Sequence, residues 1–240
     1  MDVVLKTVGL TKAFGKRVAV DNISIETYAG EIFGFLGPNG AGKTTMIKLI
    51  MGLLRRDSGD IYINEIDAHK NFEQAMENVG GIVENPEMYG YLTGLQNLQQ
   101  CKRMRRNVTD ERINEVVRIT GLENRIKEKV KNYSLGMKQR LGIAQAIMHQ
   151  PKLLILDEPT NGLDPSGIKE LREMLKNLAH TQNVGVFVSS HMLSEMQLMC
   201  DRVGIISNGA LLAVRSANEL ERSIEDTFIE IVGESNNQIN

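Results

Sequence analysis

Strand-like apolar runs alternate with helical stretches along most of the chain. "EIFGFLG" precedes "KTTMIKLIMGLL", "KLLILDE" precedes "SGIKELREMLKNLA", and "VGVFVSS" precedes "MLSEMQLMC". This order predicts an α/β domain with a largely parallel sheet. The run Leu153–Leu156 is apolar at every position, which is typical of a central strand covered by helices on both faces.

Three other parts of the chain have different patterns. The first thirty residues and "GDIYINEID" alternate between apolar and polar positions, which predicts an antiparallel piece beside the parallel sheet. Asn208-Gly209 is a type I′ turn signal and predicts a further hairpin. Between Pro86 and Pro151 the pattern is helical, with Asp110 opening one helix and Gly121 closing it.

These patterns predict one domain over residues 1–240. Residues 1–85 and 151–222 form the core with its antiparallel β part, and residues 86–150 form an inserted helical subdomain. Residues 223–240 form a C-terminal extension, whose polar and aperiodic end we expect to fray.

Composition narrows the classes of partner. The 240 residues carry a formal net charge of -2, so no overall basic field favours nucleic acid, which is not an expected partner. Cys101 and Cys200 form neither a CxxC pair nor a disulfide framework, which fits a reducing cytosol. The N-terminus does not resemble a signal peptide, and no apolar run approaches the roughly 20 residues of a membrane-spanning helix. We expect a cytoplasmic chain that does not itself cross a membrane.

A glycine-rich segment carries the strongest chemical signal. It fits GxxxxGK[ST] and lies between a predicted strand and a predicted helix. Glycines let backbone N–H groups cradle phosphate oxygens, the lysine reaches the β and γ phosphates, and the first threonine offers its hydroxyl to Mg²⁺. The predicted phosphate loop consists of Gly37, Pro38, Asn39, Gly40, Ala41, Gly42, Lys43, Thr44 and Thr45.

Two carboxylates end the most apolar strand. Asp157 and Glu158 follow Leu156, at the sheet edge where α/β folds bind ligands. Alone this signal is weak, because many buried strands end in an acid. Together with the phosphate loop it assigns Asp157 to Mg²⁺ and Glu158 to the attacking water, which predicts a nucleotide hydrolase.

A second helix start offers another anion site. In "NYSLGMKQRLGIAQAI" Ser134 is a plausible N-cap, and Gly136 permits close approach of another backbone or ligand. Considered by itself, this segment is better explained as an ordinary capped helix.

Together these motifs resemble the ATP-binding subunit of ABC transporters over nearly the whole chain. Phe14 falls where that family has an adenine-stacking aromatic, although a place in a hairpin core is the alternative. After the phosphate loop come Glu84, the signature at Ser134–Met137, the Asp157-Glu158 pair, "NGLD" and His191.

The resemblance implies a P-loop NTPase, RecA-like core and a set of roles. Two copies would close head-to-tail around two ATP molecules with Mg²⁺, and the cycle would drive separate integral membrane permease subunits from the inner face of the membrane. Lys43, Glu158 and His191 would be catalytic, with His191 contacting the γ-phosphate, and Ser134 and Gly136 would face the partner's ATP. Metal positions would be Thr44, Glu84 and Asp157. The dimer and coupling positions would be Glu84, Asn161, Gly162, Leu163 and Asp164.

Departures from the family pattern point to one branch. Leu135 and Met137 replace the usual glycine and glutamine of the signature, and we expect Leu135 to be helical. Glu84 replaces the usual glutamine, so by the resemblance an acceptor-only carboxylate would face the triphosphate; an exposed loop glutamate is the alternative. The pattern is similar to the bacitracin and lantibiotic resistance branch and implies peptide-antibiotic export. In that branch Tyr89–Leu98 would receive a permease helix, unless it is a plain surface helix start.

Two other functions are compatible with parts of this pattern. A soluble ABC ATPase of translation or DNA maintenance would usually carry two such domains, a long coiled-coil insertion or a basic face. A nucleotide-gated subunit that hydrolyses ATP weakly or not at all would explain the altered signature, but it leaves the retention of Lys43, Asp157, Glu158 and His191 unexplained.

Overall fold

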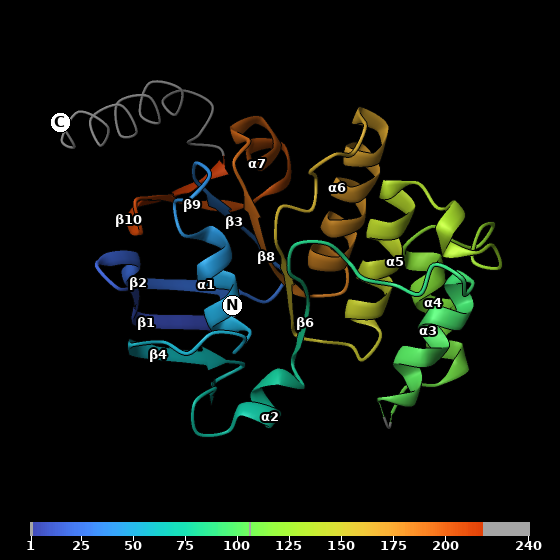
Figure 1. Cartoon of the computed structure of the whole chain (residues 1–240), viewed down its shortest axis with the longest axis horizontal. Helices are drawn as coiled ribbons and strands as arrows, with labels where there is room; N and C mark the ends of the chain where they lie inside the picture. Colours follow the sequence, from blue (N-terminus) through green and yellow to red (C-terminus); the bar gives the residue numbers. More distant parts are fainter. Residues whose placement is uncertain (1, 106, 218–240) are drawn as a thin grey trace.

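The computed structural model describes residues 2–105 and 107–217. Within these residues the chain forms one curled sheet of ten strands with helices at its sides (Figure 1). The predicted extension, 223–240, and residues 218–222 of the predicted core lie outside the described residues. The mixed α/β fold predicted from the sequence is confirmed.

Half of the sheet is parallel. In the order of the sheet, its parallel strands are β9 (Arg202–Ser207), β3 (Ile32–Leu36), β8 (Gly185–Ser190), β7 (Leu153–Leu156) and β6 (Val79–Ile82). The carboxyl ends of β3, β7 and β8 therefore meet at one edge, and the candidate residues follow these three strands directly.

The rest of the sheet is mainly antiparallel. Its strands are β1 (Val3–Phe14), β2 (Arg17–Tyr28), β4 (Ser58–Ile63), β5 (Ile66–Asp67) and β10 (Ala210–Ser216). β9 and β10 form the predicted hairpin, and Asn208 and Gly209 both have the positive φ of a type I′ turn. One parallel bridge, Ala210 to Asp21, pairs β10 with β2, and the β9–β10 hairpin connects this part of the sheet to the parallel strands.

Helices cover both faces of the parallel strands. They are α1 (Lys43–Ile50), α2 (Phe72–Met76), α3 (Gly94–Arg103), α4 (Asp110–Ile119), the 3-10 turn η1 (Val130–Asn132), α5 (Leu135–Ile147), α6 (Pro165–His180) and α7 (Leu193–Met199). Figure 1 shows α3, α4 and α5 grouped at one end and the antiparallel strands at the other. As predicted, Asp110 opens α4, and Gly121 with φ 63° follows its end.

Alternating strand residues divide the core into two clusters. Leu154 and Leu156 pack with the helices α3 to α7, whereas Leu153 and Ile155 pack with α1 and the antiparallel strands. Every side chain of β7 is buried, so the continuous apolar run is explained by cover on both faces. This packing fixes the strand ends that carry the candidate site.

One strand is shorter than its sequence predicts. The segment "GGIVENP" predicts a strand that runs to Glu84, but β6 ends at Ile82. Glu84 has φ 63°, in the left-handed region, which is incompatible with an extended strand. No helix within 2–105 or 107–217 is long and apolar enough to cross a membrane.

Candidate functional site

The predicted phosphate loop connects the end of β3 to the start of α1. Its glycines are required by packing: a Cβ at Gly37 would collide with the Ile206 carbonyl oxygen, and one at Gly42 would collide with that of Ala19. Gly42 also has φ 113°. The loop is therefore pressed against β9 and β2, and the first N–H groups of α1, which have no partner inside the helix, are aimed at the loop.

Lys43 lies inside this loop with its ammonium group fully engaged. Nζ donates to the Gly37 carbonyl at 2.7 Å and to the Pro38 carbonyl at 3.2 Å. It also lies 3.1 Å from Oε1 of Glu158, and the Lys43 side chain is only 5% exposed. The loop thus holds a desolvated cation whose charge is balanced by the predicted catalytic carboxylate.

The two carboxylates that follow β7 occupy different environments. Asp157 is 3% exposed, and its Oδ1 accepts a 2.6 Å hydrogen bond from Ser189 Oγ. Ser189 Oγ in turn accepts from the Glu158 backbone N–H at 2.9 Å. Because Glu158 has φ 47°, the chain turns sharply there, and the two side chains leave the strand toward different partners.

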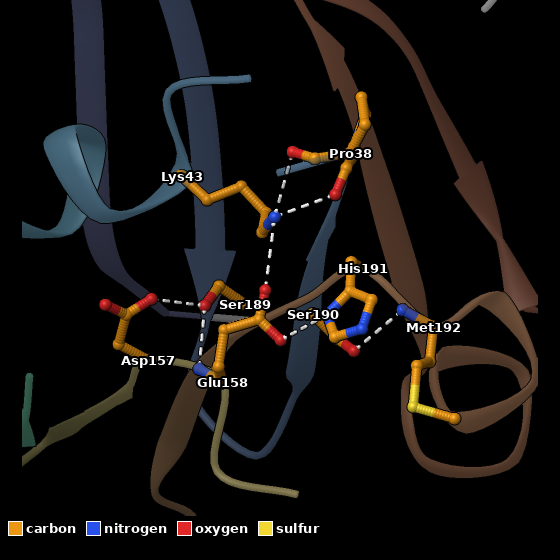
Figure 2. A network of polar contacts seen from close by, with 9 residues as sticks. Pro38, Lys43, Asp157, Glu158, Ser189, Ser190, His191 and Met192 are labelled. Atoms are coloured by element: carbon orange, nitrogen blue, oxygen red, sulfur yellow. Dashed lines mark hydrogen bonds and ion pairs between the residues drawn. The ribbon is translucent and has the colours of Figure 1, made fainter. Parts of the chain in front are cut away.

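His191, one residue after β8, completes a contact chain. Its Nδ1 lies 2.9 Å from Glu158 Oε2, so one carboxylate faces Lys43 through one oxygen and His191 through the other (Figure 2). The three residues predicted to be catalytic come from three segments far apart in sequence, and the structure brings them together. Such an arrangement fixes the orientation of Glu158 and places it between two groups able to carry positive charge.

A pocket of about 390 Å³ opens beside this cluster. Phe14 lines it and is 52% exposed, which contradicts the alternative of a hairpin-core residue. The other lining residues are Arg17, Ala19, Asn39, Gly40, Gly42, Lys43, Thr44, Thr45, Glu158 and Asn161. Arg17 was not predicted from the sequence, where one basic residue in a hairpin carries no distinctive signal.

Ser134 and Gly136 lie elsewhere, at the exposed start of α5. Ser134 is the predicted N-cap, since its Oγ accepts from the Met137 N–H at 3.2 Å. Leu135 is helical as expected and 43% exposed. A Cβ at Gly136 would meet only Leu163, at an ordinary 3.8 Å, so packing within the chain does not require a glycine there.

The segment Asn161–Asp164 connects the two regions. Asn161 lines the pocket of the phosphate loop, whereas Leu163 and Asp164 line a second pocket of about 200 Å³ together with Ser134 and Gly136. Asp164 also caps α6, where its Oδ1 accepts from the Gly167 N–H at 3.1 Å. One short turn therefore spans both candidate regions.

Glu84 is not brought to the other candidate residues. Its side chain is 65% exposed and pairs with Lys48 of α1, Nζ to Oε1 2.8 Å. The pKa of Glu84 is lowered mainly by the hydrogen bond that Lys48 donates, and secondly by the positive charge of Lys48. Glu84 does not line the pocket beside Lys43.

Two of the three predicted metal positions, Thr44 and Asp157, have oxygen donors that suit Mg²⁺. Asp157 is a buried carboxylate for which the described residues provide no ion-pair partner, and Thr44 lines the pocket. Within the described ranges no group of three or more His, Cys, Asp or Glu residues could hold a metal ion. Two protein oxygens fit a Mg²⁺ ion that takes its other ligands from phosphates and water, because Mg²⁺ rarely uses an all-protein cage.

Comparison with known proteins decides the family. The profile of the ABC transporter family matches residues 20–161, more than half of the chain. The chain belongs to the ABC transporter family. As a member it is an ATP-binding subunit and an ATPase, and the matched stretch contains the phosphate loop, Ser134 and the Asp157-Glu158 pair, while Phe14 and His191 lie outside it.

Individual relatives agree with this assignment. The uncharacterized ABC transporter ATP-binding protein YhcH of Bacillus subtilis (strain 168) is 50% identical over 95% of this chain and 75% of its own length. The bacitracin transport ATP-binding protein BcrA of Bacillus licheniformis is 47% identical over 88% of this chain and 69% of its own. The lantibiotic transport ATP-binding protein SrtF of Streptococcus pyogenes is 37% identical over 98% of this chain and 97% of its own length.

A solved ATP-binding subunit of an ABC transporter has the same fold. Its TM-score is 0.83 with 27% sequence identity, and the match covers 95% of this chain and 99% of the solved one. The predicted P-loop NTPase architecture and the family resemblance are both confirmed.

Proposed function

We propose that this ATPase powers the export of peptide antibiotics of the bacitracin or lantibiotic type through separate membrane subunits. The relatives BcrA and SrtF, named for bacitracin and lantibiotic transport, support the substrate class. Glu84, Leu135 and Met137, the departures from the common family pattern, agree with the same branch. In this proposal the chain works at the cytoplasmic face of the membrane, bound to its permease subunits.

One observation carries the catalytic part of the proposal: Glu158 lies between Lys43 and His191. When ATP enters the pocket, its phosphate oxygens compete for the Lys43 ammonium. Glu158 Oε1 is then released from its ion pair and can accept a proton from water, while His191 holds Oε2 in place. Phosphoryl transfer needs this kind of positioning more than covalent chemistry.

Thr44 and Asp157 are the residues that would hold Mg²⁺ in this site. The ion would offset negative charge on the phosphates as the bond to the γ-phosphate breaks. The chain itself contributes the buried Asp157 carboxylate, kept in position by the 2.6 Å hydrogen bond from Ser189.

A second copy of the chain is the proposed occupant of the α5 start. Ser134 is exposed, and no packing inside the chain explains the glycine at position 136. A helix start that presents free N–H groups suits a phosphate from outside the chain. A head-to-tail dimer would bring the pocket of one copy to the α5 start of the other, and ATP would join them. Loss of the γ-phosphate would then loosen the interface and drive the permease cycle.

The test is antibiotic resistance in the organism that carries the gene. The chromosomal copy is deleted and replaced by wild type, by Glu158→Gln, or by Glu173→Gln as a matched control. Glu173 lies far along α6 from its capped start and forms only a 3.9 Å exposed ion pair with Lys169. We expect deletion and Glu158→Gln to sensitise cells to bacitracin or to a lantibiotic, and Glu173→Gln to restore resistance.

Two results would contradict the proposal. If the deletion strain is no more sensitive than wild type to bacitracin or to lantibiotics, the proposal of peptide-antibiotic export is wrong. Full resistance with Glu158→Gln present at wild-type levels rejects the role of hydrolysis in that export.

A further inference from the structure

Arg17 is a charged residue of the pocket that the sequence motifs do not include. It begins β2 and pairs with Phe14, the last residue of β1, in the β1–β2 register. Both residues line the pocket. The Arg17 Nη2 donates to the Gly40 carbonyl at 2.8 Å and thereby contacts the exposed tip of the phosphate loop.

The charges of the pocket leave Arg17 without a balancing anion. Its charged lining residues are Arg17, Lys43 and Glu158. Glu158 is already paired with Lys43 at 3.1 Å, and in the ranges that the structure describes no carboxylate forms an ion pair with Arg17. A guanidinium has five N–H donors in a planar fork, and the contact with Gly40 uses one nitrogen.

We propose that Arg17 is a nucleotide-binding residue that donates to a phosphate oxygen of ATP while its contact with Gly40 holds the tip of the phosphate loop. This inference rests on the assignment of the pocket to ATP and goes beyond the roles of the motif residues. The partner is an anion because an unbalanced cation beside a helix start, whose first N–H groups have no partner inside the helix, attracts negative charge. Arginine suits phosphate geometry better than lysine, because its fork can donate two parallel hydrogen bonds.

The experiment measures equilibrium binding to the purified chain. ATP and ADP are titrated by calorimetry, and adenosine is measured by competition against a fluorescent ATP analogue. The variants are Arg17→Gln, Arg17→Lys, Lys43→Ala as a control for the site, and Lys16→Gln as a matched control. Lys16 is the exposed neighbour of Arg17, carries the same charge and does not line the pocket.

We expect Arg17→Gln to weaken ATP binding about tenfold, as loss of one charge-assisted hydrogen bond does. Adenosine binding and the midpoint of thermal unfolding should stay at the wild-type value, and Lys16→Gln should bind ATP like wild type. Arg17→Lys should recover only part of the lost affinity, since it restores charge but not the fork.

Several outcomes would overturn this inference. If Arg17→Gln binds ATP as tightly as wild type, or if Lys16→Gln loses as much ATP affinity as Arg17→Gln, Arg17 makes no specific contact with phosphate. An equal loss of adenosine and ATP affinity assigns Arg17 to the nucleoside end or to bracing of the loop alone. If Lys43→Ala binds ATP like wild type, the assignment of the pocket itself fails, which is a separate result from failure of the Arg17 contact.

Discussion

The phosphate loop and the start of α5 are both glycine-containing helix starts, but the chain uses their glycines in opposite ways. At Gly42 a side chain would collide with the Ala19 carbonyl, and φ is 113°. At Gly136 a side chain would meet only Leu163 at 3.8 Å, and the backbone is helical. The first glycine is required by the fold of this chain, whereas the second is not.

The same contrast holds for the polar groups. Lys43 is 5% exposed and has three oxygen partners inside the chain, whereas Ser134 is exposed and makes one capping contact. The loop is thus held in place before nucleotide arrives. Ser134 at the α5 start is exposed, which agrees with the proposed second copy. Variants at matched positions can separate the two cases.

Glu158→Gln should give the largest effect. Glutamine keeps the size of the side chain but cannot act as the base, so ATP hydrolysis should fall about 10²- to 10⁴-fold. ATP binding should persist, because Lys43 keeps its two carbonyl contacts. Phosphate release and ATP binding are measured on the complex with its permease subunits. Equal and slow hydrolysis by wild type and variant would instead favour a nucleotide-gated subunit without hydrolysis.

Gly42→Ala should damage folding and binding together. The added methyl group meets backbone rather than a movable side chain, and φ of 113° is strained for alanine, so we expect a loss of about 1–3 kcal/mol in unfolding free energy. Chemical denaturation with and without ATP measures this. Unchanged stability would show that the loop can shift, and would weaken the contrast with α5.

Some of this organisation could be predicted from the sequence. The phosphate loop and Asp157-Glu158 could be recognised at the ends of predicted strands, and Ser134 as a cap before a helical stretch. The role of His191 followed only from the family resemblance. Other features depend on tertiary contacts. Arg17 reaches Gly40 only because the hairpin folds over the loop, and Lys48 reaches Glu84 across 36 positions of sequence. The end of β6 at Ile82 depends on a left-handed φ at Glu84, which a glutamate does not signal.

Gly136→Ala should separate stability from activity. Alanine favours a helix over glycine by about 0.5–1 kcal/mol, and a methyl group fits beside Leu163, so the unfolding free energy should stay equal or rise. ATPase activity of the complex should still fall about tenfold, because the methyl group would obstruct the partner's phosphate at the helix start. Gly121→Ala offers a contrast. Gly121 has φ 63°, so alanine there should destabilise the fold without a direct effect at the proposed interface with the second copy. Wild-type activity in Gly136→Ala would contradict a close approach by a second copy.

Glu84→Gln should give the smallest effect, and its direction is informative. In the structure Lys48 balances Glu84, so the charge reaches a metal–nucleotide complex only if this exposed pair opens. Since exposed pairs are weak, we expect the Mg²⁺ concentration for half-maximal ATPase to change only about two- to fivefold. Glu84→Gln removes the negative charge and should raise that concentration, whereas Lys48→Gln frees Glu84 and should lower it. Opposite shifts in a Mg²⁺ titration of the complex would place Glu84 in nucleotide sensing. Curves indistinguishable from wild type for both variants would leave it an exposed loop residue outside both regions.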